Sequence, residues 1–268
     1  MRKQTKNKKE SFKVDILVLF LMLGVAMIYA YLTRDLFIGK SLFGGIVFTI
    51  PPVIYLGLRK KKNWKKLLIA ALTFGVLYGF ALSFYAEATK SWSTIPSIFN
   101  FRLFGLNTLE EIFGHGLMAM TIFTFYEHFF DTENDKKINR RYIWAILIGI
   151  FGSIALVIIK LLTPGKFSTF EYPYVVIGTI AIIPLILAVI KKPTFLPKLA
   201  LTSLYFFIFW FLIEFQAVGY NYWIYPGNYI GWVDFLNVKY PFEELFYWML
   251  LYAPTIIIYY EFFMDDGK

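Results

Sequence analysis

The sequence predicts an all-α membrane protein with about eight transmembrane helices, arranged as two parallel four-helix repeats. Three observations support this prediction. Hydrophobic residues make up 58% of the 268 positions and the mean hydropathy is +0.59, well above what soluble domains show. The apolar residues gather in runs long enough to cross a bilayer. The order of these runs and of the polar segments between them repeats once along the chain.

Eight largely apolar runs predict the transmembrane helices, because a helix needs roughly 20 residues to cross the hydrocarbon core. The first run follows a basic tail, residues 1–13, and no small-residue cleavage motif closes it, so we expect this helix to be retained. The second contains Pro51 and Pro52, which membranes tolerate where neighbouring helices satisfy the freed carbonyl groups. The runs are 14–32, 40–58, 67–87, 109–130, 142–162, 172–190, 197–218 and 242–263.

The basic residues predict the orientation of the helices. Of the 27 Lys and Arg residues, 20 fall on one side of the alternating topology, in the tail, in 59–66, 131–141 and 191–198, and at the chain end. Because positively charged loops stay in the cytoplasm, we expect a multi-pass protein of the cell membrane with both termini cytoplasmic. The net charge of +9 then reflects topology, and we expect no nucleic-acid partner.

The two halves, residues 1–135 and 136–268, are predicted to be copies of one repeated unit. The pair Glu110–Glu111 corresponds to Glu243–Glu244, 133 positions later. An even number of spans in each half gives both halves the same orientation, so the repeat is parallel and a binding cleft is expected between the halves. Further corresponding elements are 59–66 and 191–198, Pro51–Pro52 and Pro184, Glu127 and Glu261, and Asp131 and Asp265.

Six carboxylates near the predicted outer leaflet are the candidate catalytic residues. In each half one Glu closes a span ahead of a tryptophan, and a Glu–Glu pair opens the next span. Carboxylates are costly beside lipid, so their duplication points to a functional site. They are Glu87, Glu110, Glu111, Glu214, Glu243 and Glu244.

Simpler interpretations of these acids stay open. Acidic residues are common in the first turn of a helix, where they favour the helix dipole. Glu87 and Glu214 could be interfacial or paired with Lys90. Since consecutive helical residues are about 100° apart, one member of each Glu–Glu pair can face a substrate while the other bonds elsewhere. We expect Glu127 and Glu261, on the basic side, to be structural or salt-bridged.

The composition also limits the chemistry. Two histidines cannot build a multi-histidine metal site, and without cysteine there is no thiolate nucleophile. No GxGxxG fingerprint indicates a dinucleotide. We therefore expect neither a metal nor a cofactor. His115 lies one turn after Glu111 and could hydrogen-bond to it, whereas His128 is expected at the membrane interface.

The second half carries an ordered motif. Glu214 ends a span, a Trp-x-Tyr follows at Trp223 and Tyr225, glycines stand at 227 and 231, and Pro241–Glu244 reads Pro-Phe-Glu-Glu at the start of the next span. This order resembles the signature of the integral-membrane carotenoid cyclases, the lycopene cyclase domain family, in its tandem or fused form of the heterodimeric type. In the first half Glu87, Trp92 and the Glu110–Glu111 pair can be placed, with Thr108 where the proline would stand.

The resemblance implies an isomerase of carotenoid biosynthesis that closes the linear ends of lycopene-like polyenes into rings without net redox change. A carboxylic acid protonates the terminal double bond, an internal double bond attacks the cation, and a proton is lost. Desolvation and a neighbouring like charge keep one of two adjacent carboxyls protonated. We expect Glu243 or Glu244 to be the acid, with Glu214 or a first-half carboxylate as the base.

Aromatic faces would stabilise the cation and hold the polyene. The predicted substrate-binding residues are Trp92, Trp223, Tyr225, Asn228, Trp232 and Trp248. The resemblance further implies that the isoprenoid substrate enters from the lipid bilayer, and that the chain associates with other carotenoid-pathway enzymes.

Two other function classes remain. A related hydratase or isomerase of polyene or isoprenoid ends would use the same acid and pocket. A non-enzymatic lipid-binding or transport protein is the other, since parallel repeats are also a transporter architecture.

Overall fold

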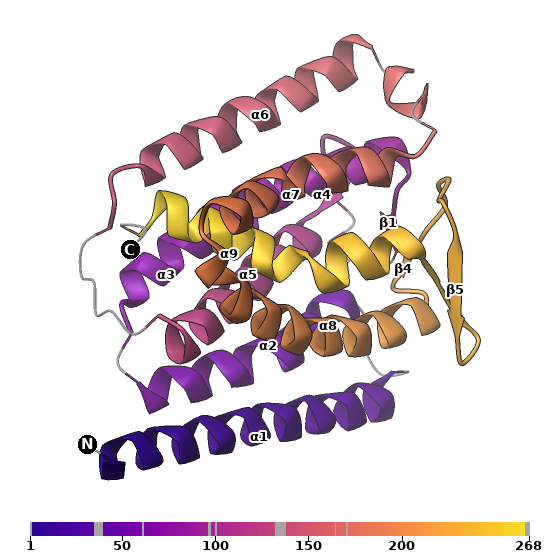
Figure 1. Ribbon diagram of the computed structural model, residues 1–268. Helices are drawn as coiled ribbons and strands as arrows, with labels where there is room; N and C mark the ends of the chain where they lie inside the picture. The colour runs from indigo at the N-terminus through magenta and orange to yellow at the C-terminus, as the bar shows by residue number, and fades with distance from the viewer. Residues whose placement is uncertain are drawn as a thin grey trace.

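The computed structural model describes residues 2–34, 40–60, 62–95, 98–99, 101–131, 138–163, 165–169 and 171–265, and these are mostly helical. The helices run roughly side by side as one bundle (Figure 1). In the first half they are α1 (Arg2–Thr33), α2 (Lys40–Arg59), α3 (Trp64–Ala70), the π-helical turns η1 (Ala71–Leu77), α4 (Tyr78–Thr89) and α5 (Leu109–Phe129). In the second half they are α6 (Tyr142–Leu162), α7 (Pro173–Lys191), α8 (Leu196–Gly219), the π-helical turns η4 (Glu244–Leu250) and α9 (Tyr252–Phe263), with short 3₁₀ turns η2 (Lys166–Thr169) and η3 (Pro193–Phe195).

Five helical segments of the described chain are long and apolar enough to cross a membrane, and a sixth results if η4 and α9, which meet at a bend of 44°, form one broken span. The two remaining predicted spans coincide with α2 and α5. These two segments are helical but are not among the helices that meet the criteria of length and hydropathy for a membrane span. The chain thus has the helices of a multi-pass membrane protein, and eight crossings remain a prediction. The five segments are Ser11–Thr33, Trp64–Thr89, Tyr142–Leu162, Pro173–Lys191 and Pro193–Gly219.

The outer helices expose large apolar side chains. α1 and α6 lie at opposite edges of the bundle (Figure 1), and only 17% of the most apolar part of each is buried. Leu32 on α1, Leu161 on α6 and Ile190 on α7 are about 70% exposed. Continuous apolar surface of this kind is unfavourable in water. It suits contact with lipid chains.

Inside the bundle, α5 packs against α2 and η1. A Cβ atom at Gly75 would lie 2.7 Å from Gly116 Cα and from the carbonyl oxygen of His115. Small residues therefore let η1 and α5 approach at backbone distance, the usual way for helices to associate in a membrane.

Short antiparallel strands, which the sequence did not predict, occupy one end of the mostly helical bundle. The loops that join the helices at this end contain backbone amides that need partners, and pairing into two-stranded ribbons provides them. The β1–β4 ribbon joins the loop after α4 to the loop after α8. The pairs are β1 (Ser93–Thr94) with β4 (Trp223–Ile224), β2 (Arg102–Leu103) with β3 (Asn107–Thr108), and β5 (Trp232–Phe235) with β6 (Val238–Pro241).

A buried ionic cluster lies at the opposite end. Lys66 is 1% exposed, and its Nζ lies 2.8 Å from Asp265 and 3.5 Å from Glu127. Carboxylate oxygens of Glu127, Asp131 and Asp265 lie within 4.8 Å of one another, an arrangement that could hold a metal ion. The Lys66 ammonium supplies a cation within this group. The prediction that Glu127 is salt-bridged is confirmed.

A second polar contact fixes α1. Asp15, which is buried, accepts hydrogen bonds from Tyr55 at 2.7 Å, Arg59 at 2.7 Å and His128 at 2.9 Å. His128, expected at the membrane interface, therefore has a specific partner. This network joins α1 to α2 and α5, and the start of α1 lies at the same end of the bundle as the end of α9 (Figure 1).

Candidate functional site

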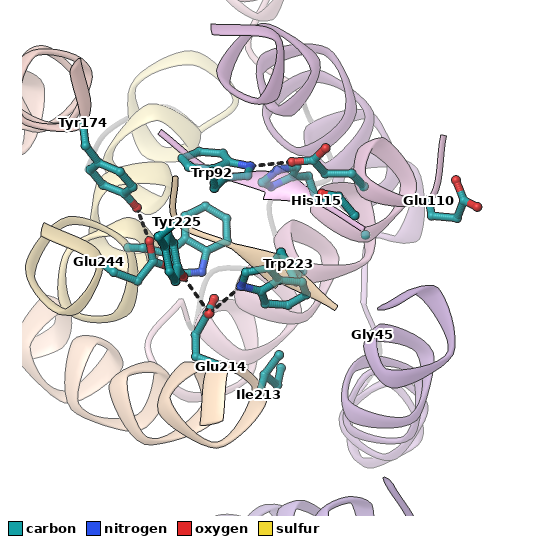
Figure 2. Close-up of a pocket in the computed structure, with 15 residues that line it drawn as sticks. Gly45, Trp92, Glu110, His115, Tyr174, Ile213, Glu214, Trp223, Tyr225 and Glu244 are labelled. Carbon is teal, nitrogen blue, oxygen red and sulfur yellow. Dashed lines mark hydrogen bonds between the residues drawn. The ribbon is translucent and has the colours of Figure 1, made fainter. Parts of the chain in front are cut away.

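A cavity of about 90 Å³ lies at the strand end of the bundle, bordered by α5, α7, α8 and η4 (Figure 2). One water needs roughly 10–15 Å³ on the same measure, so the cavity can hold a small group. Four glutamates contribute to its lining: Glu110, Glu111, Glu214 and Glu244. The other lining side chains are mostly apolar or aromatic.

On one side of the cavity the carboxyl groups of Glu214 and Glu244 lie beside each other and interact directly. Each is 3% exposed. A hydrogen bond between two carboxyl groups requires a proton, and two buried like charges in contact are unfavourable. One proton shared between the two carboxyl groups is therefore the favoured state.

Neighbouring donors surround this pair. Trp223 Nε1 donates to Glu214 at 2.8 Å and the Tyr225 hydroxyl donates to the same oxygen at 2.9 Å. The Tyr174 hydroxyl donates to Glu244 at 2.6 Å. Figure 2 shows these three donors directed at the carboxyl groups. They would stabilise the negative charge left when the pair gives up its proton.

Tyr225 lies in the loop after β4 and stays a neutral donor. Burial, and then the nearby carboxylates of Glu214 and Glu244, raises the pKa of Tyr225 well above its ordinary value.

The other side of the cavity is built by the first half. Trp92 Nε1 donates to Glu111 Oε1 at 2.6 Å, and the Ser83 hydroxyl lies 3.0 Å from His115 Nε2. Ser83 also interacts with the Glu111 carboxyl. His115 thus bonds to Ser83, a residue that the sequence did not single out, and not to Glu111 as expected.

Trp248 connects the two sides. Its ring lies 5.2 Å from the His115 ring, 6.5 Å from the Trp92 ring and 4.3 Å from the Tyr252 ring, on which it stacks. The π-helical turns of η4 place Glu244 and Trp248 on the same cavity, and such widened turns are frequent at functional sites. Aromatic faces here could stabilise a cation.

The paired glutamates point in different directions, as the 100° step between helical residues predicts. Glu111 and Glu244 face the cavity, whereas Glu110 accepts hydrogen bonds from the backbone N–H groups of Ile98 and Phe99. Glu243 likewise accepts from the Ile230 N–H at 2.6 Å. Figure 2 shows Glu110 turned away from the other carboxyls, and Glu243 does not line the cavity. These two residues hold loops.

Thr108 is the N-cap residue directly before helix α5, at the position where the motif has proline. Its hydroxyl accepts a hydrogen bond from the Glu111 N–H at 3.3 Å and so caps the helix. The Thr108 side chain, and neither Glu110 nor Glu111, caps this end of the helix. Capping by the glutamate side chains therefore does not explain why the two carboxyl groups are buried.

Three other predicted residues lie outside the cavity. Glu87 accepts from the Thr94 N–H at 2.9 Å and from Arg102 at 3.2 Å, so its cationic partner is Arg102 and not Lys90. Asn228 and Trp232 are exposed in the loop region, Trp232 by 51%. Trp232 lies outside the cavity because the β5–β6 ribbon carries its ring outward.

Tyr174 was not predicted. It lies in the first turn of α7, just after Pro173, and its ring is 5.5 Å from that of Trp92. A polar aromatic residue at the start of an otherwise apolar span is a signal that could have identified it. Ser83 has no comparable signal.

Comparison of the chain with protein family models, with curated proteins and with solved structures gave no match.

Proposed function

We propose that the chain is a membrane-embedded enzyme that protonates the end of a linear polyene or isoprenoid and closes it into a ring, as carotenoid cyclases do. One observation carries the proposal: the two buried carboxyl groups of Glu214 and Glu244 lie together in a largely apolar, aromatic cavity. A carbon–carbon double bond is a weak base, so its protonation needs an acid held in a dry site.

In the proposed reaction, the proton shared by Glu214 and Glu244 adds to the terminal double bond and leaves a tertiary cation. An internal double bond attacks this cation, a ring bond forms, and the positive charge moves to a ring carbon. Loss of a proton from a neighbouring carbon restores a double bond. The product has the mass of the substrate. Trp223, Tyr225 and Tyr174 stabilise the carboxylate, and the Trp248 ring stabilises the cation.

A second, apolar groove supports entry of the substrate from lipid. It adjoins the cavity, because Trp92, Tyr174 and Trp248 line both. Its remaining walls come from α4, α7, η4 and α9, and include Leu82, Ile177, Ala181, Tyr252 and Thr255. A cavity of 90 Å³ receives one end of a polyene, and the groove offers apolar contact to the adjoining chain.

Matching contacts support the proposed two-repeat organisation around this site. Tyr260 donates a hydrogen bond to Glu127, and Tyr126 hydrogen-bonds to Glu261, so the same contact occurs twice with the partners exchanged. These residues correspond at an offset of 134 positions. The β1–β4 ribbon joins the corresponding loops of the two halves.

Expression in a lycopene-accumulating bacterial host, followed by pigment chromatography and mass spectrometry, tests the proposal. Ring-bearing products of unchanged mass are expected from the natural chain, and Glu244→Gln is expected to abolish them because an amide cannot supply the proton. Glu261→Gln, at the other end of the bundle, serves as the control and should retain ring formation.

Unchanged lycopene from a well-expressed, membrane-inserted protein would overturn the proposal for that substrate. A product heavier by one water would indicate a hydratase. Equal loss of activity in Glu244→Gln and Glu261→Gln would mean that the acids of the cavity are structural.

A further inference from the structure

Two buried polar atoms on the first-half side of the cavity have no hydrogen-bond partner within the described residues: Oε2 of Glu111 and Nδ1 of His115. Both residues line the cavity, and His115 is only 5% exposed. Leaving such atoms unpaired is costly, so their position indicates that an occupant interacts with them. The carboxyl pair on the opposite side has several donors, so the two sides differ in chemistry.

The packing of His115 fixes the direction of its ring. A Cβ atom at Gly79 would lie 2.6 Å from His115 Cβ, 2.9 Å from Cγ and 3.2 Å from Cδ2. His115 Nε2 lies 3.0 Å from the Ser83 hydroxyl, one turn further along α4. The Cδ2–Nε2 edge therefore lies against α4. The opposite edge, which carries Nδ1, is turned away from α4.

The direction of the hydrogen bond between Ser83 and His115 depends on where the Ser83 proton goes, and this direction fixes which ring nitrogen carries a proton. The Ser83 hydroxyl has one proton, and it lies beside the Glu111 carboxyl as well as His115. If this proton is donated to the Glu111 carboxylate, His115 donates through Nε2–H to the Ser83 oxygen. Nδ1 then keeps a free lone pair. A carboxylate linked through Ser83 would stabilise the imidazolium formed when Nδ1 accepts a proton.

We propose that His115, held by Ser83 and Glu111, is the base that removes the final proton of the cyclisation. This inference rests on the proposed function. It assigns the proton-donating step to Glu214 and Glu244 of the second half and the proton-accepting step to the first half.

The step balances without a further reactant. The acid pair loses one proton to the terminal carbon, and the ring cation loses one proton from a carbon next to the charge. Nδ1 accepts this proton as the carbon–hydrogen electron pair becomes the new ring double bond. Return of one proton from the imidazolium to the acid pair, directly or through water, restores both groups.

The experiment compares the natural chain with His115→Gln in the lycopene-accumulating host and in membranes incubated in D₂O. Glutamine can still hydrogen-bond to Ser83 but cannot accept the proton. Ring formation should fall by roughly 10²–10⁴-fold, the usual contribution of a general base. The remaining rings should show a changed ratio of double-bond isomers, because another group now removes the proton.

Recovered polyene is the second readout. The carboxyl pair still protonates the substrate, so the cation of the variant returns to polyene more often, and deuterium should accumulate in the unreacted substrate. Ser83→Ala, which removes only the positioning hydroxyl, should change the isomer ratio in the same direction to a smaller extent. It keeps the test decisive if His115→Gln fails to fold. His128→Gln, on the same helix but bonded to Asp15, is the control and should keep the natural ratio.

The natural isomer ratio together with no excess deuterium in His115→Gln or Ser83→Ala would overturn the assignment while leaving the cyclase proposal intact. Absence of rings from the natural chain would instead overturn the proposed function, and this inference with it.

Discussion

At the scale of single residues, the two members of each Glu–Glu pair have different tasks. Glu244 faces the cavity and Glu243 accepts a hydrogen bond from the Ile230 N–H. The sequence placed both among the candidates, since adjacent identical residues carry no information about direction beyond the 100° step.

This difference gives a prediction. Glu243→Gln retains an oxygen that can accept from Ile230, so cyclisation should stay within about tenfold of the natural chain, whereas Glu244→Gln should lose it by at least roughly 10²-fold. Pigment chromatography at matched protein levels measures both. Comparable losses in the two variants would contradict the division of tasks.

The donors around the acid pair give a second prediction at this scale. Tyr174→Phe removes the 2.6 Å hydrogen bond to Glu244 and leaves the ring in place. Since this bond stabilises the carboxylate that remains after proton transfer, the rate should fall by roughly 10-fold or more, in line with about 1.5–3 kcal/mol for a hydrogen bond to a charged group. Tyr78→Phe, at a tyrosine of α4 that lines neither the cavity nor the groove and donates to the Ala145 carbonyl, is the matched control. A rate unchanged in Tyr174→Phe would show that the bond does not act in the reaction.

At the scale of helices, the groove between α4, α7, η4 and α9 is the proposed binding place of the polyene chain beside the cavity. Ala181→Trp would fill the groove while the cavity itself, which Ala181 does not line, keeps its shape. A full-length polyene should then be cyclised much less than a short isoprenoid that fits the cavity alone. Competition between the two substrates measures this ratio. Equal loss for both lengths would contradict the groove as the chain-binding site.

The ionic cluster at the other end holds helices together without taking part in the proposed chemistry. Lys66 on α3 pairs with Asp265 after α9 and with Glu127 on α5. Lys66→Met leaves two buried carboxylates without their cation, a change that typically costs about 3–5 kcal/mol.

We therefore expect a markedly lower thermal unfolding temperature in detergent for Lys66→Met. Lys65→Met, one residue earlier and exposed, should change stability by no more than about 0.5 kcal/mol. Similar unfolding temperatures for the two variants would contradict the role assigned to the cluster.

At the scale of the whole molecule, the arrangement of the ends bears on topology. The start of α1 and the end of α9 lie at one end of the bundle, and the strands and the cavity lie at the other (Figure 1). The distribution of basic residues predicts that the first end is cytoplasmic. Reporter fusions at both termini should therefore be active on the cytoplasmic side, and a tag in the exposed β5–β6 turn should be accessible from outside. Termini on opposite sides would contradict an even number of crossings.

Much of this organisation was predictable from local sequence. Apolar runs predicted the helical segments because length and composition are properties of a contiguous stretch. Glu111, Glu214, Glu244, Trp92, Trp223, Tyr225 and Trp248 were all singled out and all line the cavity. The β1–β4 ribbon was missed because its two strands lie far apart in the chain, and the local β2–β3 and β5–β6 hairpins were missed because strands of two to four residues are too short to show a period-2 pattern.

The sequence by itself therefore determined a helical, membrane-compatible chain with acids and aromatic residues at the ends of its spans. Only the tertiary structure decided that Glu214 and Glu244 meet in one cavity, that Glu110 and Glu243 hold loops, and that Ser83, His115 and Tyr174 belong to the site. The physical reason is that a side chain's partners and burial depend on how separate helices pack. That packing is set by many weak contacts across the whole bundle.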